Sequence, residues 1–278
     1  MSTLETTPCA YCPRLCRHAC PVATATGAES AVPATIFAIL HAHRDGREDE
    51  ETARGAASLC LGCGACTAAC VPAVPVAARL RAWRGALGHG PVAEPLGGIE
   101  GDATHVCVMG PGEAWADAWS AARGLPHAIL RTTDSLAHAS WVAGEREATA
   151  MLRHAFEGGR VAVVASLDVA EVLEGEGIPV ERLPVERLPV DSRVARFRTC
   201  FEGPEVSSAA GQLACCGRRE GFASREPEAA REVARANVRI LAGAQVVCAD
   251  QACANWLREH GGRVVGPADA LAREGSDA

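Results

Sequence analysis

The feature that most constrains this chain is the placement of its cysteines. Eight of the fourteen lie in two short runs, "CAYCPRLCRHACP" and "CLGCGACTAACVP". The runs contain Cys9, Cys12, Cys16 and Cys20, and Cys60, Cys63, Cys66 and Cys70. The N-terminus has no basic stretch followed by an apolar run, so we expect no signal peptide and a cytoplasmic protein. In a reducing compartment, so many thiols bind metal more often than they form disulfides.

The spacing within the second run is C-x2-C-x2-C-x3-C. It is typical of chains that wrap three thiolates around one [4Fe–4S] cube and send the fourth to a neighbouring cube. Glycines such as Gly62 and Gly64 suit the tight loop that this requires. The pattern predicts two crossed ligand sets: Cys9, Cys12, Cys16 and Cys70 for one cluster, and Cys60, Cys63, Cys66 and Cys20 for the other.

Both runs depart slightly from the usual pattern, without losing a ligand. The first has three residues between Cys12 and Cys16, and the second has Val71 before its proline. The alternative is structural zinc, which favours two separated C-x2-C pairs with four ligands in all, and two runs of four fit it poorly.

The segments around the runs predict helices at 33–44, 48–59 and 75–87. Pro33 stands where a helix tolerates proline, and Ile36, Ile39 and Leu40 share a face. This arrangement resembles the α-helical ferredoxin module of respiratory iron–sulfur proteins and of one component of heterodisulfide reductase, over about residues 5–88. We expect His18 and three arginines to form a solvated face; the arginines are Arg79, Arg81 and Arg84.

Beyond this module the pattern changes to α/β. Buried strands are predicted at "THVCVM", "VAVVAS" and "AQVVCA", and a helix at 226–244 with Ala229, Val233, Ala236 and Ile240 on one face. The tandem repeat "VERLPVERLPV" predicts an extended connector. The fold class is therefore α+β with two domains: a helical domain at 1–88, a Gly- and Pro-rich linker at 89–102, and an α/β domain at 103–278.

The order of the later cysteines resembles the "CCG" domain shared by another component of heterodisulfide reductase and by the iron–sulfur subunits of glycolate and lactate oxidases. The resemblance implies a lone Cys200, the motif Cys215-Cys216-Gly217, and Cys253 at the last ligand place. Asp250 stands where the first cysteine of a final pair would be, and Cys248 lies two residues earlier. Which of these two is a ligand stays open.

That family usually carries two such repeats, and fewer residues than usual separate Cys200 from Cys215. We therefore interpret 103–190 as a degenerate repeat without ligands and 191–278 as the repeat that binds a cluster. Gly110-Pro111-Gly112 has an alternative interpretation as a phosphate-binding turn.

The resemblance implies a third iron–sulfur cluster, of non-cubane shape in the best-known members. Adjacent cysteines can put two thiolates on one polynuclear cluster, and Gly217 lets the backbone approach closely. The alternative is that Cys215 and Cys216 are buried hydrophobic thiols, as we expect for Cys107 on its apolar strand.

These features predict an electron-transfer subunit of an oxidoreductase rather than a stand-alone catalyst, and they assign no catalytic residue. The chain has no dinucleotide fingerprint, so we expect no flavin here but a flavoprotein dehydrogenase as partner. A quinone or another carrier would lie beyond, with a quinone-linked membrane component holding the complex to the inner face of the membrane.

Two other functions remain as alternatives. One is a catalyst that reduces a disulfide at the C-terminal cluster, as heterodisulfide reductase does. The other is a redox or iron sensor, although no helix-turn-helix with a basic face is evident. The net charge of −7 argues against binding of nucleic acid.

Overall fold

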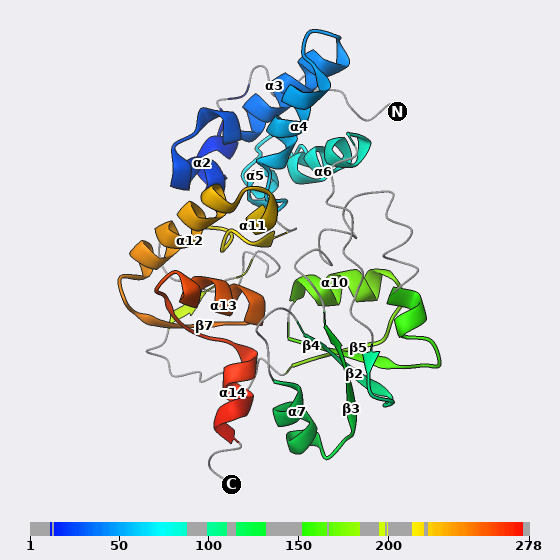
Figure 1. The fold of residues 1–278 in the computed structure, drawn as a ribbon. Coiled ribbons are helices and arrows are strands. Elements are labelled where there is room, and N and C mark those ends of the chain that lie inside the picture. Colours follow the sequence, from blue (N-terminus) through cyan, green and yellow to red (C-terminus); the bar gives the residue numbers. More distant parts are fainter. Residues whose placement is uncertain are drawn as a thin grey trace.

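The computed structural model describes residues 12, 14–87, 99–109, 115–131, 152–165, 167–183, 195–197, 199, 213–219 and 222–274. Up to residue 87 the described chain is helical, and beyond it the fold is mixed α/β (Figure 1). The helical part comprises α1 (Cys16–Ala19), α2 (Pro21–Thr26), a 3-10 turn (Glu29–Ala31), α3 (Pro33–Arg44), α4 (Glu50–Ser58), α5 (Ala65–Ala68) and α6 (Val76–Ala86). In the described ranges, no helix is both long and apolar enough to cross a membrane.

Local signals explain where these helices begin. Proline opens α2 and α3, where its missing N–H costs nothing. Asp49 caps α4 by accepting a 2.7 Å hydrogen bond from the Thr52 N–H, so this helix starts at Glu50. Ile36, Phe37 and Leu40 of α3 pack with Leu80 and Trp83 of α6 in the core of the helical part.

The first sheet has the order β1-β3-β2-β4-β5. Four strands are parallel: β2 (His105–Met109), β3 (His127–Arg131), β4 (Val161–Val164) and β5 (Val180–Arg182). The short β1 (Ile99–Glu100) pairs antiparallel with β3 and lies inside the segment predicted as a linker. Val106 and Val108 pack toward α10 (Leu167–Gly175), and Cys107 and Met109 pack toward α7 (Ala116–Arg123), so the two helices cover opposite faces.

The second sheet is smaller and entirely parallel, in the order β6-β7-β8. Its strands are β6 (Ala195–Phe197), β7 (Gln245–Cys248) and β8 (Arg263–Val265). The helices in this part are α11 (Phe222–Arg225), α12 (Pro227–Leu241), α13 (Gln251–Glu259) and α14 (Pro267–Glu274). The unit β7–α13–β8 repeats the order of β4–α10–β5 in the first sheet.

Several sequence predictions fall outside the described residues. They concern Cys9, Cys200, the Gly110-Pro111-Gly112 turn, the linker before Ile99 and the connector after Leu183.

The predicted face of α12 was correct at Val233 but wrong by one position at its other three members. Ala230, Val233, Ala234, Asn237 and Leu241 are buried, whereas the Ile240 side chain is 37% exposed. The prediction placed no polar residue in the core. Asn237 is buried nonetheless, because its side chain hydrogen-bonds the backbone near the paired cysteines.

The helical part and the second sheet share one hydrophobic core. Val22 and Val32 from the helical part pack with Phe222 and Val233 in this core, and α12 lies alongside α2 (Figure 1). The Ser58 hydroxyl also donates to the Glu226 carboxylate across the junction. The two parts are therefore joined by buried contacts.

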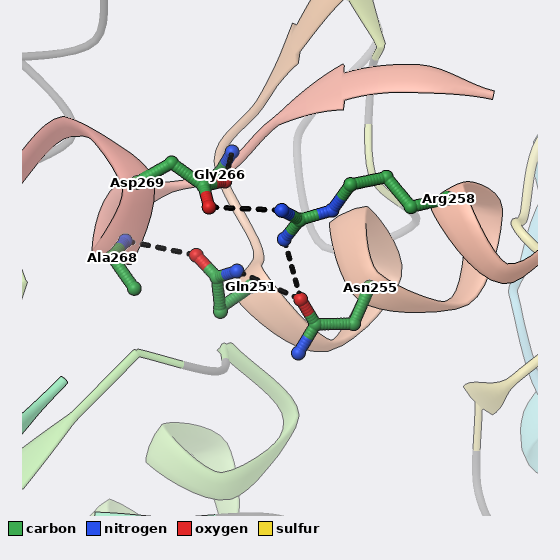
Figure 2. A network of polar contacts seen from close by, with 6 residues as sticks. All are labelled: Gln251, Asn255, Arg258, Gly266, Ala268 and Asp269. Atoms are coloured by element: carbon green, nitrogen blue, oxygen red, sulfur yellow. Dashed lines mark hydrogen bonds and ion pairs between the residues drawn. The ribbon is translucent and has the colours of Figure 1, made fainter. Parts of the chain in front are cut away.

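A polar network fixes α14 against α13 (Figure 2). The Gln251 side chain accepts a 2.8 Å hydrogen bond from the Ala268 N–H, and Arg258 pairs with Asp269 at 2.9 Å. Gly266 lies close to this network: a Cβ there would lie 2.4 Å from Gln251 Oε1, so a larger residue would displace the Gln251 side chain. The network holds the first turn of α13, which carries Cys253.

Candidate metal centres

Four cysteines from the two runs line one pocket in the helical part. They are Cys20, Cys60, Cys63 and Cys66. Apolar side chains such as Ile36, Leu61 and Leu80 complete its wall. This is one of the two crossed sets that the spacing predicts, and the structure brings all four members together.

The loop between α4 and α5 carries Cys60 and Cys63, and Cys66 follows in the first turn of α5. Gly62 and Gly64 have φ values of +70° and +78°, in the left-handed region that favours glycine. The Gly62 N–H lies 3.3 Å from Cys60 Sγ as a hydrogen-bond donor. Such donors stabilise negative charge on a ligating sulfur.

Burial makes these thiols weak acids in the metal-free chain. It raises the pKa of Cys20 to about 11, with repulsion from Cys60 adding to the effect. Burial also raises the pKa of Cys66, followed by repulsion from Cys60 and Cys20. Since only thiolates ligate, a metal centre here would supply the positive charge that the pocket lacks and would displace the thiol protons.

Three members of the second crossed set, Cys12, Cys16 and Cys70, lie at or near α1 and interact there. Burial raises the pKa of Cys16, and the Cys12 and Cys70 thiols raise it further by repulsion, which places the three near one another. Cys70 follows α5, which contacts α1. Cys9, the fourth predicted member, lies outside the described residues.

The arrangement of these cysteines around a pocket suits a polynuclear cluster better than a single ion. A zinc ion draws its ligands to about 2.3 Å from one point. Throughout the described ranges, no three His, Cys, Asp or Glu side chains converge closely enough to hold one metal ion. The cysteines of the pocket instead surround a cavity.

Residues 5–74 match the family model of a 4Fe-4S dicluster domain. The match covers both cysteine runs and ends before α6. The chain is thus a ferredoxin-type iron–sulfur protein whose N-terminal part binds [4Fe–4S] clusters. Neither the curated proteins nor the solved structures gave a match.

Two arginines converge on the backbone of this dicluster domain beside its pocket. Arg84 donates to the Cys60 carbonyl at 2.6 Å and Arg225 at 3.3 Å. Arg84 is only 3% exposed, so the prediction that it belongs to a solvated face was wrong. Its guanidinium stays in the core because it hydrogen-bonds the Cys60 carbonyl. Arg225 comes from α11, and no sequence pattern indicates either contact.

A second group of thiols lies buried in the C-terminal part. Cys216 Sγ is 3.1 Å from Cys253 Sγ, a hydrogen-bond distance well beyond the ~2.05 Å of a disulfide. Cys253 also hydrogen-bonds Cys248. Cys215 is buried next to them in the same core.

The paired cysteines are held by a glycine and an asparagine. Gly217 has φ +103°, and a Cβ there would lie 2.7 Å from the Ala230 carbonyl oxygen. Asn237 donates to the Cys215 carbonyl at 3.0 Å and accepts from the Leu213 N–H at 2.9 Å. Close packing on α12 therefore fixes the course of the loop.

The surroundings of Cys253 and Cys248 raise the pKa of both thiols. The hydrogen bond with Cys216 lowers the pKa of Cys253, but the hydrogen bond with Cys248 and burial outweigh it, so the pKa lies well above that of a free thiol. Burial raises the pKa of Cys248 as well. Cys107 lies apart on β2, where burial raises its pKa to about 12.

Asp250, one of the two predicted ligand candidates, is 1% exposed, and its carboxylate accepts two hydrogen bonds from backbone N–H groups. Its Oδ1 accepts from the Cys253 N–H at 2.7 Å, as a cap of α13. Its Oδ2 accepts from the Leu167 N–H at 2.7 Å, at the start of α10. The sequence did not predict this link between the two sheets.

Proposed function

We propose that this chain is an electron-transfer subunit of an oxidoreductase complex, relaying electrons between a flavoprotein dehydrogenase and a quinone or another carrier. The main observation behind the proposal is that the thiol sites of the chain lie next to one another in the fold. Cys20 and Cys63 of the dicluster pocket pack against the same core that contains Cys216 and Cys253. Iron–sulfur clusters accept and donate single electrons, and such packing suits short steps between them.

The arrangement gives the relay an order. The group of Cys12, Cys16 and Cys70 does not belong to the core shared with the second sheet, whereas Cys20 and Cys63 pack on it. We place the pocket site between the Cys16 site and the C-terminal thiols. Electrons would then enter or leave the chain at the Cys16 site or at the C-terminal thiols.

The C-terminal thiols are proposed to hold a third cluster in a CCG-type domain. Four buried cysteines support this: Cys215, Cys216, Cys248 and Cys253. In the first sheet, Ala165 and Ala170 occupy the places that Cys248 and Cys253 occupy in the second, as expected of a repeat that has lost its ligands.

The cluster content is tested by anaerobic purification of the full-length chain, followed by iron and sulfide analysis and EPR. We expect two [4Fe–4S] signals and more iron than two cubes contain. Stoichiometric zinc without iron would overturn the assignment of both runs. Iron for two cubes alone would remove the third cluster and leave the dicluster domain.

The partner is tested by copurification from the native host. We expect a flavoprotein to copurify, and the isolated chain to contain no flavin and to show little dehydrogenase activity. Rapid oxidation of a hydroxy acid by the purified chain alone would refute the proposal. Rapid reduction of a disulfide would favour the alternative of a heterodisulfide reductase-like catalyst, for which the close approach of Cys216 and Cys253 is the supporting observation.

A further inference from the structure

We infer that Cys248, rather than Asp250, completes the thiolate set of the C-terminal site, and that Asp250 ties this site to the degenerate half of the domain. The inference rests on the proposed third cluster and names its ligands. It assigns ligation to Cys248 and structural support to Asp250, whereas in a C-x2-C pair the residue at position 250 would itself be a ligand.

The position of Cys248 favours ligation. It is the last residue of β7, it is fully buried, and its thiol hydrogen-bonds Cys253. Cys253 in turn lies 3.1 Å from Cys216. Cys253 of α13 is thus contacted by one thiol from the CCG loop and by another from the end of β7, and thiolates are the ligands that iron–sulfur clusters take.

The carboxylate of Asp250 is already committed elsewhere. One oxygen caps α13 through the Cys253 N–H, and the other accepts from the Leu167 N–H, each at 2.7 Å. The carboxylate therefore lies between the N-termini of two helices, where backbone donors and helix dipoles both stabilise its negative charge. Turning either oxygen onto a metal would take the acceptor away from a buried N–H, which is unfavourable.

The same contacts give the degenerate half a structural role. Its Leu167 N–H binds Asp250, and its Ala165 carbonyl accepts from the Gln251 N–H at 3.1 Å. By the repeat, Leu167 stands at the place of Asp250 and Ala165 at the place of Cys248. The half that has no cysteines at these places therefore supports the turn that presents Cys253.

The test compares Cys248→Ser and Asp250→Asn in the full-length chain, purified anaerobically, with Cys107→Ser as the matched buried-thiol control. Iron content, EPR and thermal melting are measured for each. We expect Cys248→Ser to lose the iron beyond that of the dicluster domain while the dicluster signals remain. We expect Asp250→Asn to keep that iron, to melt at a lower temperature, and to raise the midpoint potential of the third signal, because a negative charge beside it is removed. Cys107→Ser should keep all of the iron.

The opposite pattern would overturn the inference: full iron in Cys248→Ser, or loss of the third signal in an Asp250→Asn protein that still melts cooperatively. If Cys248→Ser fails to fold, Cys248→Ala supplies the same test without a buried hydroxyl. Iron for only two cubes in the wild-type protein would refute the third cluster itself. The iron content of the wild-type protein is therefore measured before any variant is made.

Discussion

At the scale of single residues, Gly217 combines a positive φ with close backbone contact on α12. Its φ of +103° excludes most side chains, and the Ala230 carbonyl and Val233 leave no room for a methyl group. The glycine thereby lets the loop with Cys215 and Cys216 lie directly on α12.

We predict that Gly217→Ala destabilises the protein by about 2–4 kcal/mol, from backbone strain together with the clash on α12. The measurement is the free energy of unfolding in denaturant. Gly243→Ala is the control, because Gly243 also has a positive φ of +76° but nothing within 4 Å of its Cβ position. It should cost only ~1–2 kcal/mol. Equal losses in the two variants would contradict the close contact.

The residue scale also shows what the sequence could and could not predict. The cysteine runs could be interpreted because ligand spacing is a local property, and the pocket gathers the predicted set of Cys20, Cys60, Cys63 and Cys66. Arg84 and Asn237 could not, because their partners are backbone carbonyls and amides distant in sequence, brought near only by folding. Polar residues placed by such long-range contacts resemble surface residues in the sequence.

At the scale of elements, the short helix α11 connects the C-terminal part to the dicluster pocket. Arg225 reaches the Cys60 carbonyl from this helix, while Ser58 binds Glu226 at the junction with α12. A guanidinium beside a cluster ligand stabilises the reduced cluster, which carries one more negative charge.

We predict that Arg225→Gln lowers the midpoint potential of the cluster at the Cys60 site, on the order of 50 mV for a lost interaction of about 1 kcal/mol. A redox titration followed by EPR measures the shift. Arg235→Gln is the control, since Arg235 is exposed and pairs with Glu232 on the outer side of α12. An unchanged or raised potential in Arg225→Gln would show that α11 does not influence the cluster.

Helix positions were easier to predict than helix faces. Proline and acidic residues mark where α3 and α4 start, and α3 spans the predicted residues 33–44. The buried face of α12 was predicted incorrectly because a polar residue, Asn237, lies at its centre.

At the scale of the whole molecule, the shared core makes the dicluster domain depend on the rest of the chain. Ala31, Val32 and Leu61 are buried in that core with Val233 and Leu257. Their partners in the C-terminal part lie well over a hundred residues later in the sequence. No local sequence pattern therefore predicts this contact between the two parts.

We predict that a fragment ending near residue 90 keeps the ferredoxin-type EPR signals but loses them at a temperature lower by about 5 °C or more than in the full chain. Part of its apolar surface becomes exposed when the C-terminal part is absent. Thermal loss of the signals, followed in parallel for fragment and full chain, measures the effect. Identical profiles would mean that the shared core adds no stability.

The same shared core has a consequence for biosynthesis. Both cysteine runs leave the ribosome well before α12, and at 5–20 residues per second the interval is about 8–30 s. During that time the wall of the pocket near Cys20 and Cys63 is open, and iron and sulfide can reach it. We therefore expect the supply of iron and sulfide during this interval to raise the fraction of chains that acquire their clusters.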